Sequence, residues 1–534
     1  MVESGDWVVP RVQDRARLNK PPLIYWLQSA SVMVLGDAPG QYRNGNIWVF
    51  RLPSVLCAIA SVLLTWRLGL RLMDPRAAAL GAGLLAVCPM VAWDAHQARA
   101  DQLLLLTVVA SQHALFVCWR HTQGGRKDRQ APLIWCVYLW ASVGLGVLAK
   151  GPITPMIVSL TLGALCLQSR RMPRHRGTEA APLVDSSEPG AQATGLDAFK
   201  LFFALRPLLG LGIVLAVVAP WVVTVALRIG WAEYLGTIYE ETVGRSAAAR
   251  EGHWGPPGYH LVLLCVLFWP GVMFTGLALR RAWKRQRRPG ELFLLAWIVP
   301  AWIAFELVAT KLPHYTMPLY PAIALLSGRA VLAAASGTLI GIHEWGTRIG
   351  LAIWALVGVG IMVAGLALLS LLSRFDDVND AAMVTSLWYL PIGFVLVMVL
   401  RSMLAGEWLQ AQLRSMVAVV MMLVLLFTTL APAANRMSTR VVQAINDIDP
   451  KGERPITAVG YQEDSLIFLT RGRVRRAAAV DLRALLSNPG EAVLVLPDID
   501  MPGEAPSRHQ GIRGLNYSRG RVESVQIFWW ELQQ

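Results

Sequence analysis

Long apolar stretches separated by short polar connectors occupy most of the first 431 residues of this chain. A helix that crosses a bilayer needs about 20 mainly apolar residues. Twelve stretches approach that length: 49–70, 78–93, 102–118, 131–149, 152–168, 207–227, 260–279, 291–309, 316–336, 349–373, 385–400 and 413–431. The pattern predicts an all-α polytopic membrane protein with about twelve transmembrane helices.

The pattern differs at both ends of this apolar region. After residue 431, short β-rich runs such as PITAVGY and EAVLVLP alternate with Pro, Gly and charged residues, which is typical of strands. We therefore expect a small α/β domain outside the membrane at 432–534, and a transmembrane domain at 49–431. Residues 1–48 are expected to form an outward-facing loop with an interfacial helix, because the run at 21–36 spans only about 24 Å as a helix.

The basic residues indicate the orientation of the chain. Alternate connectors are rich in Arg and Lys, as in 119–130 and 280–288, whereas the connectors between them, including the loop 228–259, are less basic. The positive-inside rule places the basic connectors in the cytoplasm. We expect a multi-pass protein of the bacterial inner (plasma) membrane, with the other connectors and the C-terminal domain in the periplasm.

Composition excludes several classes of protein. The chain of 534 residues is 55% hydrophobic and only 16% charged, whereas soluble domains carry about 25% charge. The formal net charge of +14 would suggest a nucleic-acid partner in a soluble protein. Here the basic residues lie in membrane connectors, so no nucleic-acid partner is expected.

Polar residues with chemical potential gather in or near the outward connectors. They are Lys20, Asp94, His96, Arg99, Asp101, Lys150, Glu240, Glu241, Arg245, His253, Lys311, His314 and Tyr315. Charged residues in the middle of the apolar stretches are nearly absent, although ion-coupled transporters usually need them there. This distribution favours an enzyme that acts at one face of the membrane.

Three short motifs carry the candidate chemistry, and each also has a plain structural explanation. In LNKPPLIYWL, the rigid Pro-Pro holds Lys20 where it could bind a phosphate, or where it could simply anchor the segment. In ARADQLLLL, Asp101 could act as a base or metal ligand, or could cap a helix. In TKLPHYTMPLY, Lys311 and Tyr315 could be ordinary interfacial residues, but His314 adds a titratable donor.

The order of these motifs resembles a known family. SGDWVVP, KPPLIYWLQ, ARADQLLL, KGPI, GHWGPPGYH and KLPHYTMPLYPAIALL follow one another as in GT-C membrane glycosyltransferases of the dolichyl-phosphate-mannose protein mannosyltransferase and lipid A aminoarabinose transferase type. The resemblance covers roughly residues 1–430. It implies transfer of a sugar from a polyprenyl-phosphate donor to an envelope glycolipid such as lipid A, or to another envelope acceptor. Membrane lipids are the other expected partners.

The resemblance also implies roles for individual residues. Lys20 matches the lysine that contacts the lipid-linked phosphate, and Asp101 matches the family's second acidic position, so these two are the predicted catalytic residues. The predicted donor-phosphate site comprises Lys20, Lys311, His314 and Tyr315. The accessory candidates are Arg99, Lys150, Arg245 and His253, the last of which matches a loop histidine implicated in metal binding.

The chain departs from the family pattern in two places. Family members have a transmembrane helix and an acidic motif before the ESGDW segment, whereas this chain starts at that segment, so we expect a truncated or misassigned start. The residue before Lys20 is Asn19 instead of the usual Glu, which makes a bound divalent metal doubtful. Two alternatives remain: a transporter or flippase for a lipid-linked sugar, and an inactive membrane scaffold that lacks the first acidic motif.

Overall fold

The computed structural model describes most of the chain. The described residues are 1–2, 4–13, 15–18, 20–36, 47–123, 131–171, 198–240, 244, 255–338, 345–372, 379–434, 436–461, 463–477, 493–497, 508–516 and 521–529. They divide into two compact units. Unit 1 comprises residues 1–360 and 395–420, and unit 2 comprises residues 361–394 and 421–534.

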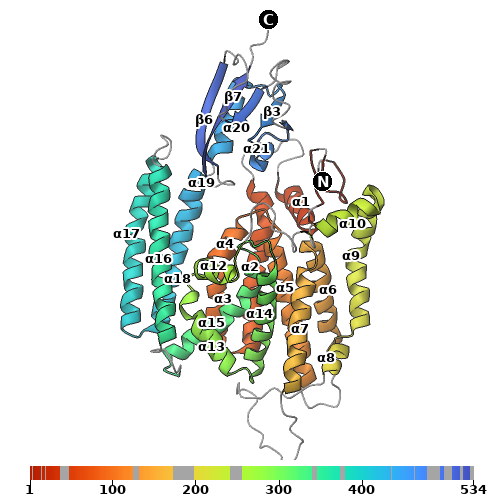
Figure 1. The fold of residues 1–534 in the computed structure, drawn as a ribbon, viewed down its shortest axis with the longest axis vertical. Coiled ribbons are helices and arrows are strands. Elements are labelled where there is room, and N and C mark those ends of the chain that lie inside the picture. Colours follow the sequence, from red (N-terminus) through yellow and green to blue (C-terminus); the bar gives the residue numbers. More distant parts are fainter. Residues whose placement is uncertain are drawn as a thin grey trace, which may run out of the picture. The chain divides into compact units, whose positions relative to one another are not determined.

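Helices of membrane-spanning length dominate the described part of the chain (Figure 1). Nine of the described segments are long and apolar enough to cross a membrane. They are α2 (Ile47–Leu72), α5 (Asp101–Gln123), α6 (Leu133–Lys150), α9 (Pro207–Ile229), α14 (Pro289–Leu307), η2 with α15 (Met317–Leu319 and Tyr320–Ala335), α16 (Trp345–Leu372), α17 (Asn379–Leu404) and α18 (Trp408–Leu425). The predicted polytopic helical class is confirmed.

Three of the twelve predicted spans differ from single membrane-length helices. The stretch 78–93 is split between α3 (Pro75–Ala86) and α4 (Pro89–Ala95), which are bent by 54° and give a tenth span only if counted together. The stretch 260–279 is divided between α12 (Tyr259–Leu267) and α13 (Val272–Lys284), and the apolar part of α7 (Ile153–Arg171) is short. The proline that begins α4 lacks the N–H that a continuous helix requires.

A short helix, α1 (Leu23–Leu35), occupies the region where an interfacial helix was predicted. The chain before it is tied to two helices. The Asp6 carboxylate accepts a hydrogen bond from Arg228 of α9 at 2.7 Å, and the Trp26 indole of α1 donates to the Trp7 carbonyl at 2.8 Å. These bonds fix the N-terminal segment beside α1, from which Lys20 emerges.

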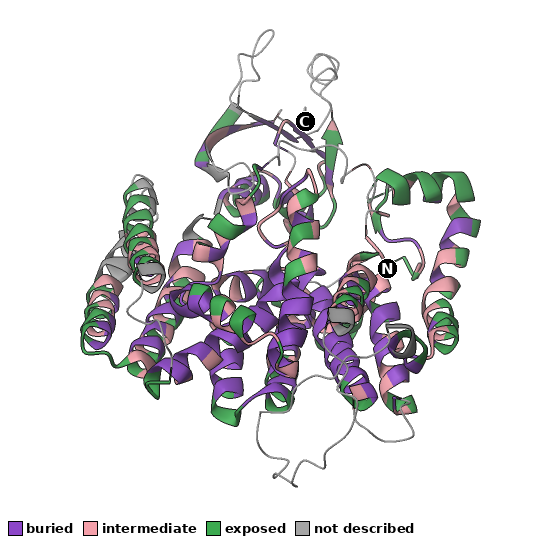
Figure 2. Ribbon diagram, turned by 60° about the horizontal axis from the view of Figure 1, so that its bottom comes forward, coloured by how far each residue is buried: buried purple, intermediate pink, exposed green. Residues whose placement is uncertain are grey.

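The core of unit 1 is built around α5, nearly all of whose residues are buried. Figure 2 shows buried residues concentrated in the inner helices. Small residues allow the surrounding helices to approach closely. A Cβ added to Gly328 of α15 would lie 2.5 Å from the main-chain nitrogen of Gly81 in α3. Close backbone approach at small residues is typical of helix packing in membranes, and it brings the segment before α15 next to the start of α5.

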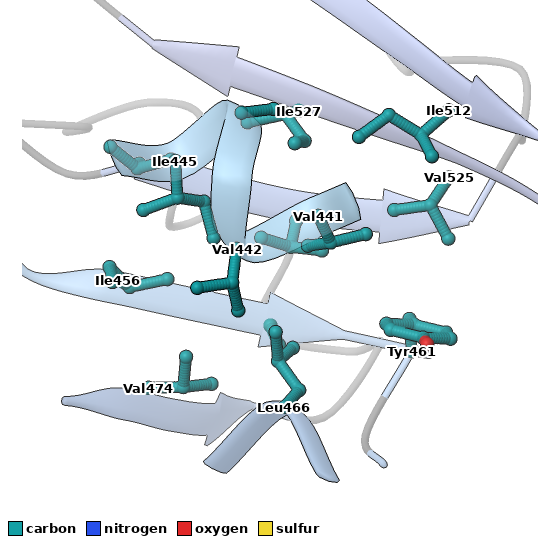
Figure 3. Close-up of a cluster of buried hydrophobic side chains, with 14 of the residues drawn as sticks. Val441, Val442, Ile445, Ile456, Tyr461, Leu466, Val474, Ile512, Val525 and Ile527 are labelled. Atoms are coloured by element: carbon teal, nitrogen blue, oxygen red, sulfur yellow. The ribbon is translucent and has the colours of Figure 1, made fainter. Parts of the chain in front are cut away.

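Unit 2 contains the predicted C-terminal α/β structure. A five-stranded sheet has the order β4-β3-β5-β7-β6, with parallel pairing of β3 to β4 and β5 and antiparallel pairing of β7 to β5 and β6. Helix α20 (Arg436–Ile448) packs its apolar residues onto this sheet (Figure 3). The elements are β3 (Ile456–Val459), α21 (Asp464–Leu469), β4 (Val474–Ala477), β5 (Val493–Pro497), β6 (Arg508–Asn516) and β7 (Arg521–Trp529).

The remaining elements are short. They are β1 (Arg11–Val12), β2 (Arg15–Ala16), α8 (Ala198–Ala204), α10 (Trp231–Tyr239), η4 (Leu426–Leu430) and α19 (Ala431–Ala434).

The domain boundaries at 48 and 431 stay predictions.

Candidate active site

Four segments of unit 1 bring the candidate residues together. Lys20 precedes α1, Asp101 is the first residue of α5, and Lys150 is the last residue of α6. His314 and Tyr315 lie in the connector between α14 and η2. Helices that run in alternate directions place the start of one beside the end of the next, so residues far apart in sequence meet at one end of the bundle.

Asp101 is the centre of this group and is only 1% exposed. Its carboxylate accepts a hydrogen bond from the Lys150 ammonium. His314 Nε2 lies 3.5 Å from one carboxylate oxygen, and Arg99 Nε lies 3.7 Å from the other. The start of a helix favours a negative side chain, but the surrounding cations are the larger reason that a carboxylate can be buried here.

Lys20 adds a further cation to the group. The pKa of its ammonium is lowered to about 8, mainly by burial and also by the positive charge of Lys150, while Asp101 acts in the opposite direction. Among the described residues, none accepts a hydrogen bond from Lys20 or forms an ion pair with it. The structure therefore presents a half-buried cation whose charge is not neutralised by a direct partner.

His314 and Tyr315 lie next to Asp101 and Lys150, respectively. The His314 ring is buried, and this burial lowers its pKa to about 3, so the imidazole is neutral near pH 7. Its ring meets the Tyr315 ring edge-on with centroids 5.3 Å apart, and the Lys150 ammonium lies 5.8 Å from the centroid of the Tyr315 ring. His314 is thus a neutral hydrogen-bonding group, and Tyr315 is an aromatic contact for a cation.

Lys311 is engaged elsewhere in the same segment. Its ammonium lies 3.3 Å from the Glu306 carboxylate and also bonds to the Glu306 main-chain oxygen. The same carboxylate accepts hydrogen bonds from the main-chain N–H groups of Gly258 and His260, at 3.2 and 3.1 Å. This arrangement fastens the start of α12 to the end of α14, so Lys311 organises the chain around the site.

Asp94 lies near this group, although its sequence motif gave it no predicted role in the site. Its side chain is completely buried at the end of α4, and its carboxylate makes no hydrogen bond within the described part of the chain. Arg99 lies 4.0 Å from Asp94 and 3.7 Å from Asp101, so one guanidinium is placed near both acids. The spacing of the two acids around an arginine in WDAHQARAD was the available signal.

Two predicted accessory residues, Arg245 and His253, lie outside the described residues. Asn19, whose presence made a bound metal doubtful, lies outside them as well. In the part of the chain that is described, no three His, Cys, Asp or Glu side chains come together as a metal site.

Comparison with known proteins agrees with the predicted resemblance. The family described as dolichyl-phosphate-mannose-protein mannosyltransferase matches residues 19–183. The fold matches the crystal structure of ArnT from Cupriavidus metallidurans bound to undecaprenyl phosphate, with a TM-score of 0.66, 18% identity, and coverage of 98% of this chain and 91% of that one. The chain has the fold of ArnT. It resembles the GT-C glycosyltransferases, as the order of its motifs predicted.

The curated relatives that match this chain are named as arabinosyl transferases. The undecaprenyl phosphate-alpha-4-amino-4-deoxy-L-arabinose arabinosyl transferase of Pseudomonas aeruginosa UCBPP-PA14 is 29% identical over 375 residues, or 70% of this chain. The Erwinia tasmaniensis protein of that name is 26% identical over 330 residues, covering 61% of this chain and 52% of its own length. The chain spans 58% of the length of the Pseudomonas relative that it matches.

Proposed function

We propose that this chain is a polyprenyl-phosphate-sugar-dependent glycosyltransferase. It transfers a pentosyl or hexosyl group, of the aminoarabinose kind, to an envelope glycolipid such as lipid A at the periplasmic face of the bacterial inner membrane. The observation that carries the proposal is the gathering of Lys20, Lys150 and Arg99 around one buried carboxylate. The ArnT fold and the names of the relatives support this proposal.

The chemistry requires a group that stabilises the departing lipid phosphate. When the bond between the sugar and the phosphate oxygen breaks, negative charge develops on that oxygen, and preorganised cations and donors lower the barrier. Lys20 is suited to this role because its ammonium has no direct partner among the described residues. The neutral His314 imidazole and the Tyr315 side chain supply further polar contacts beside it.

Asp101 is better suited to positioning than to proton removal. Its carboxylate already faces Lys150, Arg99 and His314, and the cations among these partners stabilise its charged form. It holds the cations in place for the donor phosphate. An acceptor phosphate, which is already ionised, could attack the sugar without a base, whereas a hydroxyl acceptor would have to lose a proton.

A transfer assay with matched lysine variants tests the proposal. Purified protein is supplied with undecaprenyl-phosphate-aminoarabinose and lipid A, and modified lipid A is measured by mass spectrometry. We expect Lys20→Ala to lower kcat/KM by at least 100-fold, the scale of losing a preorganised charged contact. Lys451→Ala serves as the control because Lys451 is exposed and lies in unit 2.

Each outcome of this assay bears on the proposal. Transfer by the wild-type chain and the Lys451 variant, with loss in the Lys20 variant, supports it. Equal turnover in all three removes Lys20 from the site. No transfer by a folded wild-type chain with any polyprenyl-phosphate sugar supports the inactive-scaffold alternative instead.

A further inference from the structure

Four arginines meet at the other end of α14 from the candidate active site. Arg281 lies in the last turn of α13, Arg285 directly follows that helix, Arg288 directly precedes α14, and Arg329 belongs to α15. All four are only partly exposed, and the side chain of Arg329 is 13% exposed. We call them the arginine cluster. The other basic residues of this connector, Arg280, Lys284 and Arg287, are exposed.

Among the described residues, the charge of the arginine cluster is offset mainly by one acid, Glu291. Glu291 acts on both Arg281 and Arg329, and it is 3.0 Å from the Arg329 guanidinium. The pKa of Arg281 is lowered to about 10, mainly by burial and also by the charges of Arg285 and Arg329. Four arginines against one glutamate leave a net charge of about +3 in a partly buried place, which is costly without an anion.

The cluster is separate from the candidate active site. Helix α14 has 19 residues and is therefore about 28 Å long. The arginine cluster surrounds its first turn, whereas Glu306 near its last residue belongs to the segment beside His314. A ligand at the cluster would not be the sugar donor bound at Lys20.

The role of basic residues in setting membrane orientation does not by itself explain this arrangement. The positive-inside rule requires basic residues in a connector but does not require them to be buried together. Lysine and arginine side chains normally extend their charged ends into water, as the exposed Arg280, Lys284 and Arg287 do. The four residues of the arginine cluster are instead only partly exposed, and their charges act on one another near the contacts of α13, α14 and α15.

We propose that the arginine cluster binds the phosphate of an anionic phospholipid headgroup. Guanidinium groups bind phosphate oxygens through paired hydrogen bonds, and basic pockets between transmembrane helices recognise acidic lipid headgroups. The apolar surfaces of the surrounding helices would contact the acyl chains. A bound headgroup would supply the negative charge that the described residues lack and would join α13 to α15.

Lipid retention in native mass spectrometry tests the proposal. The full chain is purified from nanodiscs of phosphatidylcholine alone or with 20% cardiolipin, and the bound lipids are counted after mild detergent extraction. We expect wild-type protein to retain cardiolipin, and Arg281→Gln with Arg285→Gln to reduce the retained fraction at least fivefold. The control pair Lys284→Gln with Arg287→Gln removes the same charge from exposed positions and is expected to retain it.

The outcomes distinguish a specific lipid site from non-specific electrostatic attraction of the lipid to basic residues. Equal loss in both pairs, or no preference of the wild type for cardiolipin, would overturn the proposal. Competition by inorganic phosphate at millimolar concentration, with no retained lipid, would show a free-anion site and would also overturn it. If the Arg281 and Arg285 double variant does not fold, the wild-type lipid preference and the single variant Arg288→Gln decide the question by the same criteria.

Discussion

Replacing Lys150 with methionine is expected to destabilise unit 1, because it leaves a carboxylate buried without its closest cation. Asp101 is 1% exposed, and the Lys150 side chain is 16% exposed and bonded to it. Methionine keeps most of the length and apolar volume of lysine, so the loss is mainly electrostatic. Removing one partner of a buried pair typically costs about 3–5 kcal/mol.

The remaining neighbours reduce this cost but do not remove it. Arg99 lies 3.7 Å from Asp101, but its side chain is 37% exposed, so solvent screens its charge. His314 is neutral near pH 7, so its ring, 3.5 Å from Asp101, contributes no full charge. We therefore expect the free energy of unfolding to fall by about 3 kcal/mol, at the lower end of the usual range.

A double-mutant cycle measures this coupling. The free energy of unfolding is obtained by titrating SDS into mixed micelles for the wild type, Lys150→Met, Asp101→Asn and the double variant. The double variant is expected to be about 2 kcal/mol more stable than the sum of the single effects predicts, because it removes both charges together. Additive effects within about 0.5 kcal/mol would refute the idea that this pair is mutually required.

Three further predictions concern pH, packing and the second aspartate. Because burial lowers the pKa of Lys20 to about 8, its ammonium is lost above that pH, and kcat/KM should fall there. The free energy of unfolding should rise between about pH 8 and pH 10.5, because the unfolded state holds more protons over that range. An unchanged pH profile in Lys20→Arg would contradict this prediction. Gly328→Ala should lower stability by about 1–3 kcal/mol in thermal unfolding, since its Cβ meets backbone at 2.5 Å, whereas Gly163→Ala, with open space, should not destabilise. Asp94→Asn should lower kcat more than substrate affinity by releasing Arg99, and an equal loss in expression level and activity would indicate a purely structural role.

Local sequence patterns were sufficient for the class of protein and for most of the helices. The run at 207–227 became α9, and the stretch 413–431 contains most of α18, because a long apolar segment in a membrane has no good alternative to a helix. The break between α3 and α4 was harder to place. Pro89 is visible in the sequence, but prolines also occur inside intact helices here, as Pro220 does in α9.

The candidate site shows where sequence patterns stop being informative. Lys20, Asp101 and His314 were identified from motifs whose order and spacing resemble a family. Their partners were less visible: Lys311 bonds to Glu306, and Asp94 shares Arg99 with Asp101. Such pairings depend on which helix ends meet, and that is decided by packing across residues that are distant in sequence.

Periodicity and composition determined that this chain is a multi-helix membrane protein, because the cost of exposing backbone and charge to lipid constrains every long apolar run in the same way. The packing of glycine-bearing helices determined which distant side chains come together. It brought Lys150 to Asp101 across 49 residues of sequence and placed Arg281 and Arg329 near one glutamate, Glu291. The strength of a charge interaction depends on the distance between the two groups, so only the tertiary structure could decide which charges neutralise one another and which are left for a ligand.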